Sequence, residues 1–238
     1  MPEATSTHVV VHHGQRELTG VARPDESWAA AAHRIAATVP GDPVASDLSG
    51  EPKQFAVDTD LHVTLRAMSR GDLPVVTTWR QSAHVHRWWV SDGEPTLEAV
   101  TEAYGPSVDG MTPKRMWIAE VNGRSVGLIQ DYRIADYPDF AVLAPDVEAI
   151  GLDYLVGDPH WIDRGIGTRM LWAWLERMRR RFPEARTCFA APDHRNHASL
   201  RVLDKVGFTR GVWFDEPLAN GTVTTVIGCT LDVRRVLG

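Results

Sequence analysis

From residue 61 onward, the hydrophobic and polar positions follow the periods of short strands and amphipathic helices. Alternating or continuously apolar runs, which are typical of strands, cover residues 61–68, 116–121, 125–130, 149–156, 187–191, 209–214 and 222–231. Apolar residues at helical spacing cover a segment that begins after Asp72 and residues 96–104, 166–181 and 198–206. The pattern therefore predicts an α/β domain with the element order β-α-α-β-β-β-α-β-α-β-β.

Turn and capping residues support these element ends. Asn122-Gly123 favours the type I′ turn of a hairpin, and Asn220-Gly221 is expected to join the last two strands in the same way. Asp72 is expected to cap the first helix. Gly207 follows the last helix, where a left-handed residue commonly ends one.

Residues 1–58 differ from the rest and are predicted to form a small extension and linker in front of a domain over residues 59–238. A strand is expected at residues 8–11, and a helix at residues 25–39 that Pro40 ends. Residues 40–54 are rich in Pro, Gly, Asp and Ser and are interpreted as the linker.

The composition excludes several classes of protein. The 238 residues carry a net charge of −6, which argues against a nucleic-acid-binding module. No apolar run reaches the roughly 18 residues of a membrane helix, and the N-terminal residues lack a signal sequence, so a cytoplasmic protein without a membrane partner is expected. Cys188 and Cys229 lie in apolar segments and are expected to be buried thiols. The histidines lack the partners of a zinc site, so no metal is expected.

A glycine-containing turn connects the strand at residues 149–156 to the helix at residues 166–181. Gly165-Ile166-Gly167 opens this helix with bare backbone amides, which together with the helix dipole favour a pyrophosphate. A tight strand-to-helix turn without a ligand remains the alternative. A dinucleotide-binding loop is disfavoured because Met170 stands where a third glycine would be needed.

With the element order, this loop resembles the acetyl-CoA-binding signature of the GNAT N-acetyltransferases, Gln/Arg-x-x-Gly-x-Gly/Ala. Ile162 replaces the leading Gln/Arg, while both glycines are in register. The resemblance implies the GNAT fold, a mixed and mostly antiparallel seven-stranded sheet with helices on both faces. It also implies acetyl-CoA as the acyl donor. The residues implied in binding it are Leu155, Val156, Arg164, Gly165, Ile166, Gly167, Thr168 and Asn196.

Residues 61–232 resemble more closely the aminoglycoside 6′-N-acetyltransferases, enzymes of antibiotic resistance. The likeness lies in Leu65-Arg66, His86-Arg-Trp-Trp89, Pro95-Thr-Leu-Glu-Ala-Val100, Tyr104-Gly-Pro-Ser-Val108, Gly151-Leu-Asp-Tyr154 and Lys205-Val-Gly-Phe208. It implies that Asp153 lies beside the acceptor amine and that Trp88 and Trp89 wall the acceptor site. Because adjacent side chains point apart, one tryptophan is expected in the pocket and the other in the core.

A second motif leaves the acceptor open. Pro192-Asp-His-Arg-Asn196 resembles a motif of the N-acyltransferases that act on lysine or hydroxylysine amines in siderophore assembly. The two resemblances therefore imply different acceptors, although both are small-molecule amines. A monomer or a homodimer is expected in either case.

The segment between residues 131 and 158 is strongly acidic. It contains seven acidic residues and one arginine, which gives a local charge of −6, equal to the net charge of the whole chain. A field of this sign would attract a cationic amine, although a solvated acidic loop is the alternative. The residues expected to bind the acceptor here are Asp131, Tyr132, Asp136, Asp139 and Asp153.

The transfer needs a base, because the amine must lose a proton before it attacks the thioester. We expect Asp153 to be this base, because an ionisable residue inside an apolar strand is costly to bury and is therefore expected to have a function. A structural salt bridge is the alternative. Leu203 stands where the resembled family has a tyrosine that protonates the departing thiolate. The proton donor is therefore left open among water, Tyr154 and His194, and a catalytically silent CoA-binding domain stays a third alternative.

Overall fold

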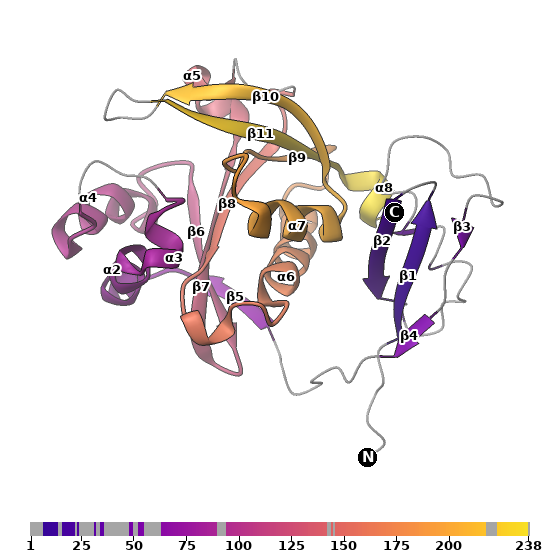
Figure 1. The fold of residues 1–238 in the computed structure, drawn as a ribbon. Helices are drawn as coiled ribbons and strands as arrows, with labels where there is room; N and C mark the ends of the chain where they lie inside the picture. Colours follow the sequence, from indigo (N-terminus) through magenta and orange to yellow (C-terminus); the bar gives the residue numbers. More distant parts are fainter. Residues whose placement is uncertain are drawn as a thin grey trace.

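The computed structural model describes residues 7–13, 16–21, 23, 31, 34–35, 48–49, 52–54, 63–89, 94–141, 144, 146–217 and 223–237. Within them, a seven-stranded sheet has the strand order β10-β11-β9-β8-β7-β6-β5 (Figure 1). Its strands are β5 (Val63–Ala67), β6 (Arg115–Val121), β7 (Arg124–Arg133), β8 (Ile150–Val156), β9 (Thr187–Ala190), β10 (Thr209–Pro217) and β11 (Val223–Asp232). The helices are α2 (Leu73–Gln81), α3 (Ala83–His86), α4 (Leu97–Val108), α5 (Pro138–Ala141), α6 (Ile166–Arg181), α7 (His197–Val206) and α8 (Val233–Leu237). The predicted order of strands and longer helices is confirmed.

Strands β8 and β9 are the parallel pair of this sheet, and they pair over a very short length. Their register contains only Ile150 with Cys188 and Gly151 with Phe189. On its other side, β8 pairs with β7 along its whole length, from Ile150 to Val156. The last five residues of β8 therefore have a partner strand on one edge only, and the sheet opens there.

Helices cover both faces of the sheet, as predicted (Figure 1). The alternation of β6 shows how the sequence builds the two cores. Met116 and Ile118 belong to the cluster that contains Val76 of α2, whereas Trp117 belongs to the cluster that contains Trp174 of α6. Because successive side chains of a strand point to opposite faces, one strand serves both cores.

Asp131 lies in the core between the sheet and α6. Its side chain accepts hydrogen bonds from Arg115 Nε at 2.9 Å, Trp117 Nε1 at 2.7 Å and Trp174 Nε1 at 3.0 Å. The residue is 3% exposed. Asp131 thus joins β6, β7 and α6 through one buried carboxylate, which is stable there because charged donors and N–H groups surround it.

The turn predictions have mixed outcomes. Asn122 and Gly123 have φ angles of 50° and 78°, so the predicted I′-type turn is confirmed. The Asn220-Gly221 turn lies outside the described residues. Asp72 stands before α2, but its carboxylate accepts from Ser69 and Arg66 rather than from the helix, so the expected side-chain cap is wrong. These two partners hold the pKa of Asp72 at about 2.

A smaller sheet lies within the N-terminal residues. Strand β1 (Thr7–His13) pairs with β2 (Arg16–Val21), β3 (Leu48–Ser49) and β4 (Pro52–Gln54). The predicted strand at residues 8–11 is confirmed, but β3 and β4 correct the interpretation of residues 40–54 as a linker only. Strands β3 and β4 are too short to show an alternation of polar and apolar residues in the sequence. They are recognisable as strands only from their pairing with β1. The predicted helix at residues 25–39 lies largely outside the described residues. The three residues of it that are described, Ala31, Arg34 and Ile35, are helical. The division at residue 58 stays a prediction.

Two expectations from composition can be compared with the structure. Cys188 and Cys229 are buried free thiols, as expected. No helix among the residues described above is long and apolar enough to cross a membrane.

Replacement of Asp131 tests its structural role. Asp131→Ala leaves the Arg115 guanidinium and two indole N–H groups without their shared acceptor. Removal of one partner from a buried charged pair costs about 3–5 kcal/mol of unfolding free energy. We expect a loss of this size in urea unfolding followed by tryptophan fluorescence. Asp136→Ala, at an exposed position, is the control, and equal midpoints for the two variants would contradict the role.

Candidate active site

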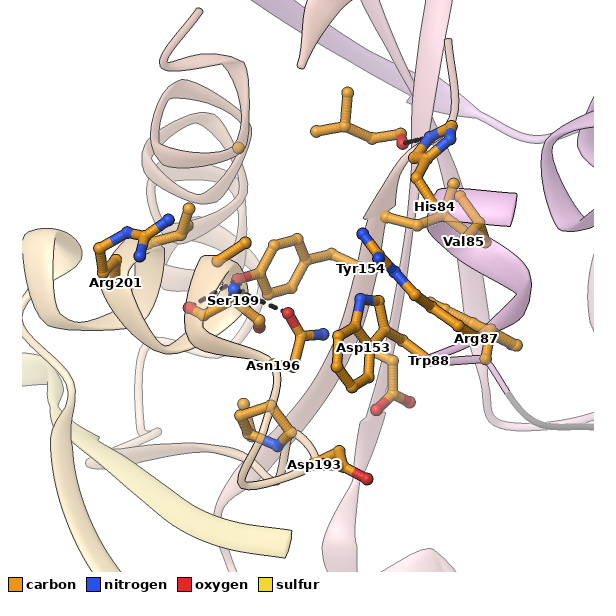
Figure 2. A pocket seen from close by; sticks show the side chains of 18 of the residues that line it. His84, Val85, Arg87, Trp88, Asp153, Tyr154, Asp193, Asn196, Ser199 and Arg201 are labelled. Atoms are coloured by element: carbon orange, nitrogen blue, oxygen red, sulfur yellow. Dashed lines mark hydrogen bonds between the residues drawn. The ribbon is translucent and has the colours of Figure 1, made fainter. Parts of the chain in front are cut away.

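A cavity of about 760 Å³ opens where β8 separates from β9. Its walls come from α3, the second half of β8, the first turn of α6, the residues after β9, and α7. Figure 2 shows Trp88, Asp153 and Asn196 on different walls of this cavity. The gap in the sheet is therefore a pocket that is large enough for a small-molecule site.

Asp153 lies on β8 directly opposite Gln130 of β7. Gln130 Nε2 donates to Asp153 Oδ2 at 2.7 Å, and the Tyr132 hydroxyl is a second hydrogen-bond partner. Burial raises the pKa of Asp153, while Gln130, the charge of Lys114 and Tyr132 act in the opposite direction. A carboxyl group with a raised pKa on a pocket wall is well suited to accept a proton.

Glu216 is a second carboxylate of the cavity, and sequence analysis missed it. It lies near the end of β10, and burial and then the charge of Asp153 raise its pKa. The predicted strand stopped at residue 214, whereas β10 continues to Pro217. If the strand had been predicted to continue to residue 217, the alternation of side chains would have put Glu216 on the same face as Phe214. This alternation was the sequence signal that could have found Glu216.

The acidic segment contributes less to the cavity than its charge suggested. Among the described side chains of this segment that were expected to bind the acceptor, Asp153 alone lines the cavity. Tyr132 is a hydrogen-bond partner of Asp153. Asp131 is in the core, and Asp136 is exposed in a 3₁₀ turn outside the cavity. The side chain of Asp139 is outside the described part. The acidic residues that the structure places are therefore divided between the core, the cavity and the surface, and they do not form one continuous field.

Trp88 and Trp89 both line the cavity, at the end of α3. Trp89 also packs against the core beside α2, with the Arg80 guanidinium 5.7 Å from its ring. The same segment brings His84, whose Nε2 is 3.0 Å from the carbonyl oxygen of Val156. Sequence analysis missed α3 because a four-residue helix has no measurable period.

The glycine loop opens α6 as expected, but its residues have separate roles. Gly165 has φ = 73° and begins the helix without a side-chain cap. A Cβ on Gly167 would stand 3.2 Å from Val202 of α7, so this glycine lets two helices pack closely. Arg164 stacks on Trp161 at 4.6 Å and does not line the cavity. Leu155, Val156 and residues 165–168 do line it.

Helix α7 forms the opposite wall. Asn196 Oδ1 caps the helix by accepting from the Ser199 amide at 3.1 Å. The Tyr154 hydroxyl lies 2.8 Å from Ser199 Oγ, and burial raises the pKa of Tyr154 (Figure 2). Leu203 is buried in the core, and its hydrocarbon side chain has no acidic proton to donate. Arg201 and Lys205, one turn apart, also line the cavity and were not expected there.

The motif at residues 192–196 is partly structural. Asp193 accepts from Arg195 and from Thr224 of β11, and the Arg195 hydrogen bond lowers the pKa of Asp193. His194 Nδ1 lies 3.0 Å from the Thr225 carbonyl oxygen, and the ring stacks near Trp213. His194 is therefore held against β11 and is not part of the cavity wall.

The charged residues of the cavity lie on two of its walls. Arg201 and Lys205 make the wall on α7 cationic, whereas Asp153 and Glu216 put carboxylates on the wall formed by β8 and β10.

Comparison with known proteins identifies the family. A family profile described as an acetyltransferase (GNAT) domain matches residues 69–215. The chain belongs to the GNAT acetyltransferase family. It is an acyltransferase, with acetyl-CoA as the donor, so a catalytically silent domain is no longer an alternative.

Individual relatives are similar over most of their length. Aminoglycoside N(6′)-acetyltransferases type 1 of Klebsiella pneumoniae and of Serratia marcescens are both 31% identical over 168 residues, covering 70% of this chain and 79% of each relative. A crystal structure of aminoglycoside acetyltransferase AAC(6′)-Ib with coenzyme A and kanamycin superposes with a TM-score of 0.63 and 27% identity. It covers 73% of this chain and 96% of that one.

The cationic wall gives a first test of the donor site. Arg201→Glu with Lys205→Glu should raise the KM for acetyl-CoA about tenfold at low salt, because phosphate groups would then meet carboxylates. The KM for the acceptor should change little. The control is Arg180→Glu with Arg234→Glu, which changes the net charge equally at exposed positions outside the cavity. Similar effects of the two pairs on the acetyl-CoA KM would remove α7 from the donor site.

Proposed function

We propose that this enzyme transfers the acetyl group of acetyl-CoA to a primary amine of a polycationic small molecule, the 6′-amine of an aminoglycoside. The observation that carries the proposal is the pair of carboxylates, Asp153 and Glu216, on the wall of one cavity. Two carboxylates can hold an acceptor with more than one ammonium group. The relatives named as aminoglycoside acetyltransferases support the same acceptor. Because acetyl-CoA is a cytoplasmic metabolite, the proposal describes a cytoplasmic enzyme that inactivates an antibiotic.

The donor is proposed to lie along α7, β8 and the start of α6. The uncapped amides from Arg164 to Thr168 at the start of α6 would bind the pyrophosphate, with Arg201 and Lys205 beside other phosphate oxygens. Arg164 would contribute its backbone amide, since its side chain stacks on Trp161. Asn196 uses Oδ1 as a helix cap, so its Nδ2 is the group proposed to meet the pantetheine. The backbone of Leu155 and Val156, which β9 does not pair, would bind the thioester arm.

The chemistry follows from this placement. Asp153 takes a proton from the ammonium group, and the neutral amine attacks the thioester carbonyl, which a backbone N–H of β8 polarises. The C–N bond forms, the C–S bond breaks, the nitrogen releases its second proton to solvent, and the thiolate receives a proton. The Tyr154 hydroxyl is proposed to protonate the sulfur, because it lines the cavity and carries a proton that it can donate.

A second candidate acceptor is a lysine-type or hydroxylysine amine. The observation that favours it is the motif at residues 192–196, of which Pro192, Asp193, Arg195 and Asn196 line the cavity. Such an acceptor carries fewer positive charges than an aminoglycoside. It would therefore depend less on Glu216.

Glu216 gives the experiment that separates the two acceptors. Thiol release from acetyl-CoA is measured with kanamycin-type sugars and with hydroxylysine, at low and high salt. Glu216→Gln should lower kcat/KM for the sugar at least about tenfold, the size of a lost hydrogen bond to a charge, and should flatten its salt dependence. Asp215→Asn, on the exposed face of β10, is the matched control. Turnover of hydroxylysine alone would refute the aminoglycoside acceptor.

Asp153 gives a test of the base. Asp153→Asn should lower kcat at least about a hundredfold while the acetyl-CoA KM stays unchanged. Since the pKa of Asp153 is raised, wild-type kcat/KM should fall as pH drops through a value above the ordinary carboxyl range of about 4. The pH at which Asp153 titrates depends on the charged and polar groups around it, which are Lys114, Tyr132, Gln130 and Glu216.

The variant should lack this acid limb, because Asn cannot be protonated there. Asp136→Asn serves as the control and should keep the wild-type profile. A loss smaller than threefold at saturating substrate, or an unchanged acid limb in Asp153→Asn, would exclude Asp153 as the base.

A further inference from the structure

The buried side-chain amide of Gln130 has a hydrogen-bond partner at one end only. Its Nε2 donates to Asp153 Oδ2 at 2.7 Å, and the residue is 7% exposed. Its Oε1 is buried and has no hydrogen-bond partner among the residues that the structure describes. Gln130 also lines the cavity. The amide therefore contacts Asp153 with one end and leaves the other end unpaired.

The contact with Asp153 determines which way the amide faces. A flipped amide would bring Oε1 against the carboxylate oxygen and would replace an attraction with a repulsion. A buried carbonyl oxygen without a partner costs about 1–3 kcal/mol of stability. A methionine of similar length would fill the same volume without this cost. Stability alone therefore does not explain a glutamine at this position.

The strand register explains why Gln130 acts on Asp153. Gln130 and Tyr132 are two residues apart on β7 and point to the same face, where β8 presents Asp153. Asp131, between them, points to the other face and into the core. Both donors toward Asp153 thus come from one strand, which the sheet holds rigidly.

We propose that Gln130 is a positioning residue for the transfer, and that its Nε2 holds the Asp153 carboxylate in the orientation that meets the acceptor amine. This inference rests on the proposed role of Asp153 as the base. Gln130 also favours the ionised carboxylate, since a donor stabilises the charged form. Without it, the burial of Asp153 would act with less opposition, and the pKa of Asp153 would be higher.

Two variants and a control test the inference. Gln130→Met removes the donor and keeps the volume, and Gln130→Glu keeps the shape but turns the donor into an oxygen that repels Asp153. Gln81→Met is the matched control, because Gln81 is exposed and donates only to the Pro95 carbonyl oxygen at 3.1 Å. The measurements are kcat, both KM values, the pH profile of kcat/KM and the melting temperature.

We expect the acid limb to move to higher pH in Gln130→Met and further in Gln130→Glu, and to stay unmoved in Gln81→Met. In Gln130→Met, kcat at neutral pH should fall about tenfold or more, with the acetyl-CoA KM within about twofold. Its melting temperature should change little, because the loss of the hydrogen bond to Asp153 and the removal of the unpaired oxygen act in opposite directions. The order of the three pH profiles is the readout that a structural role would not produce.

Other outcomes overturn the inference or the function separately. A lower melting temperature in Gln130→Met with the wild-type pH profile would make Gln130 structural and overturn the inference alone. Wild-type turnover of lysine-type amines only would refute the aminoglycoside acceptor, while the variants would still test Gln130 on that amine. A wild-type chain that acetylates no amine would overturn both.

Discussion

The short pairing between β8 and β9 is the constraint on which the rest of the structure depends. Two parallel strands that share two pairs and then separate leave the second half of β8 without a partner strand on one edge. Unpaired N–H and C=O groups inside a protein need partners. A substrate that brings its own amides can supply them, which is why the gap is proposed as the binding surface for the donor. Helices α6 and α7 pack against each other through Gly167 and Val202, and both line this gap.

The alternation of β7 separates structure from chemistry at neighbouring residues. Asp131 and Asp153 belong to one acidic segment and lie on adjacent strands, yet one carboxylate stabilises the core and the other faces the cavity. The difference comes from the period of two along β7, which sends Asp131 toward α6 and Gln130 toward Asp153. Charge summed along the chain cannot distinguish these positions, because it ignores the face on which each residue lies.

The same reasoning shows what could be predicted from the sequence. The bounds of α6 and the turn at Asn122-Gly123 were predictable because long periodic helices and type I′ turns depend on local residues. Asp153 could be proposed because a charge within an apolar strand is conspicuous. Glu216, His84 and Gln130 required the structure, since their places depend on where a strand ends, on a helix of one turn, and on which strands are neighbours. The role of Gly167 in packing against Val202 also depends on tertiary contacts.

The position of Glu216 has a consequence for how such an enzyme changes over time. Glu216 lies near the end of β10, which is an edge strand of the sheet, whereas the proposed donor wall comprises α6, α7 and β8. Edge residues contact fewer neighbours, and substitutions there seldom disturb the fold. On the proposed assignment, a single substitution on this strand would change the preference for an acceptor. It would leave the residues of the proposed donor wall in place.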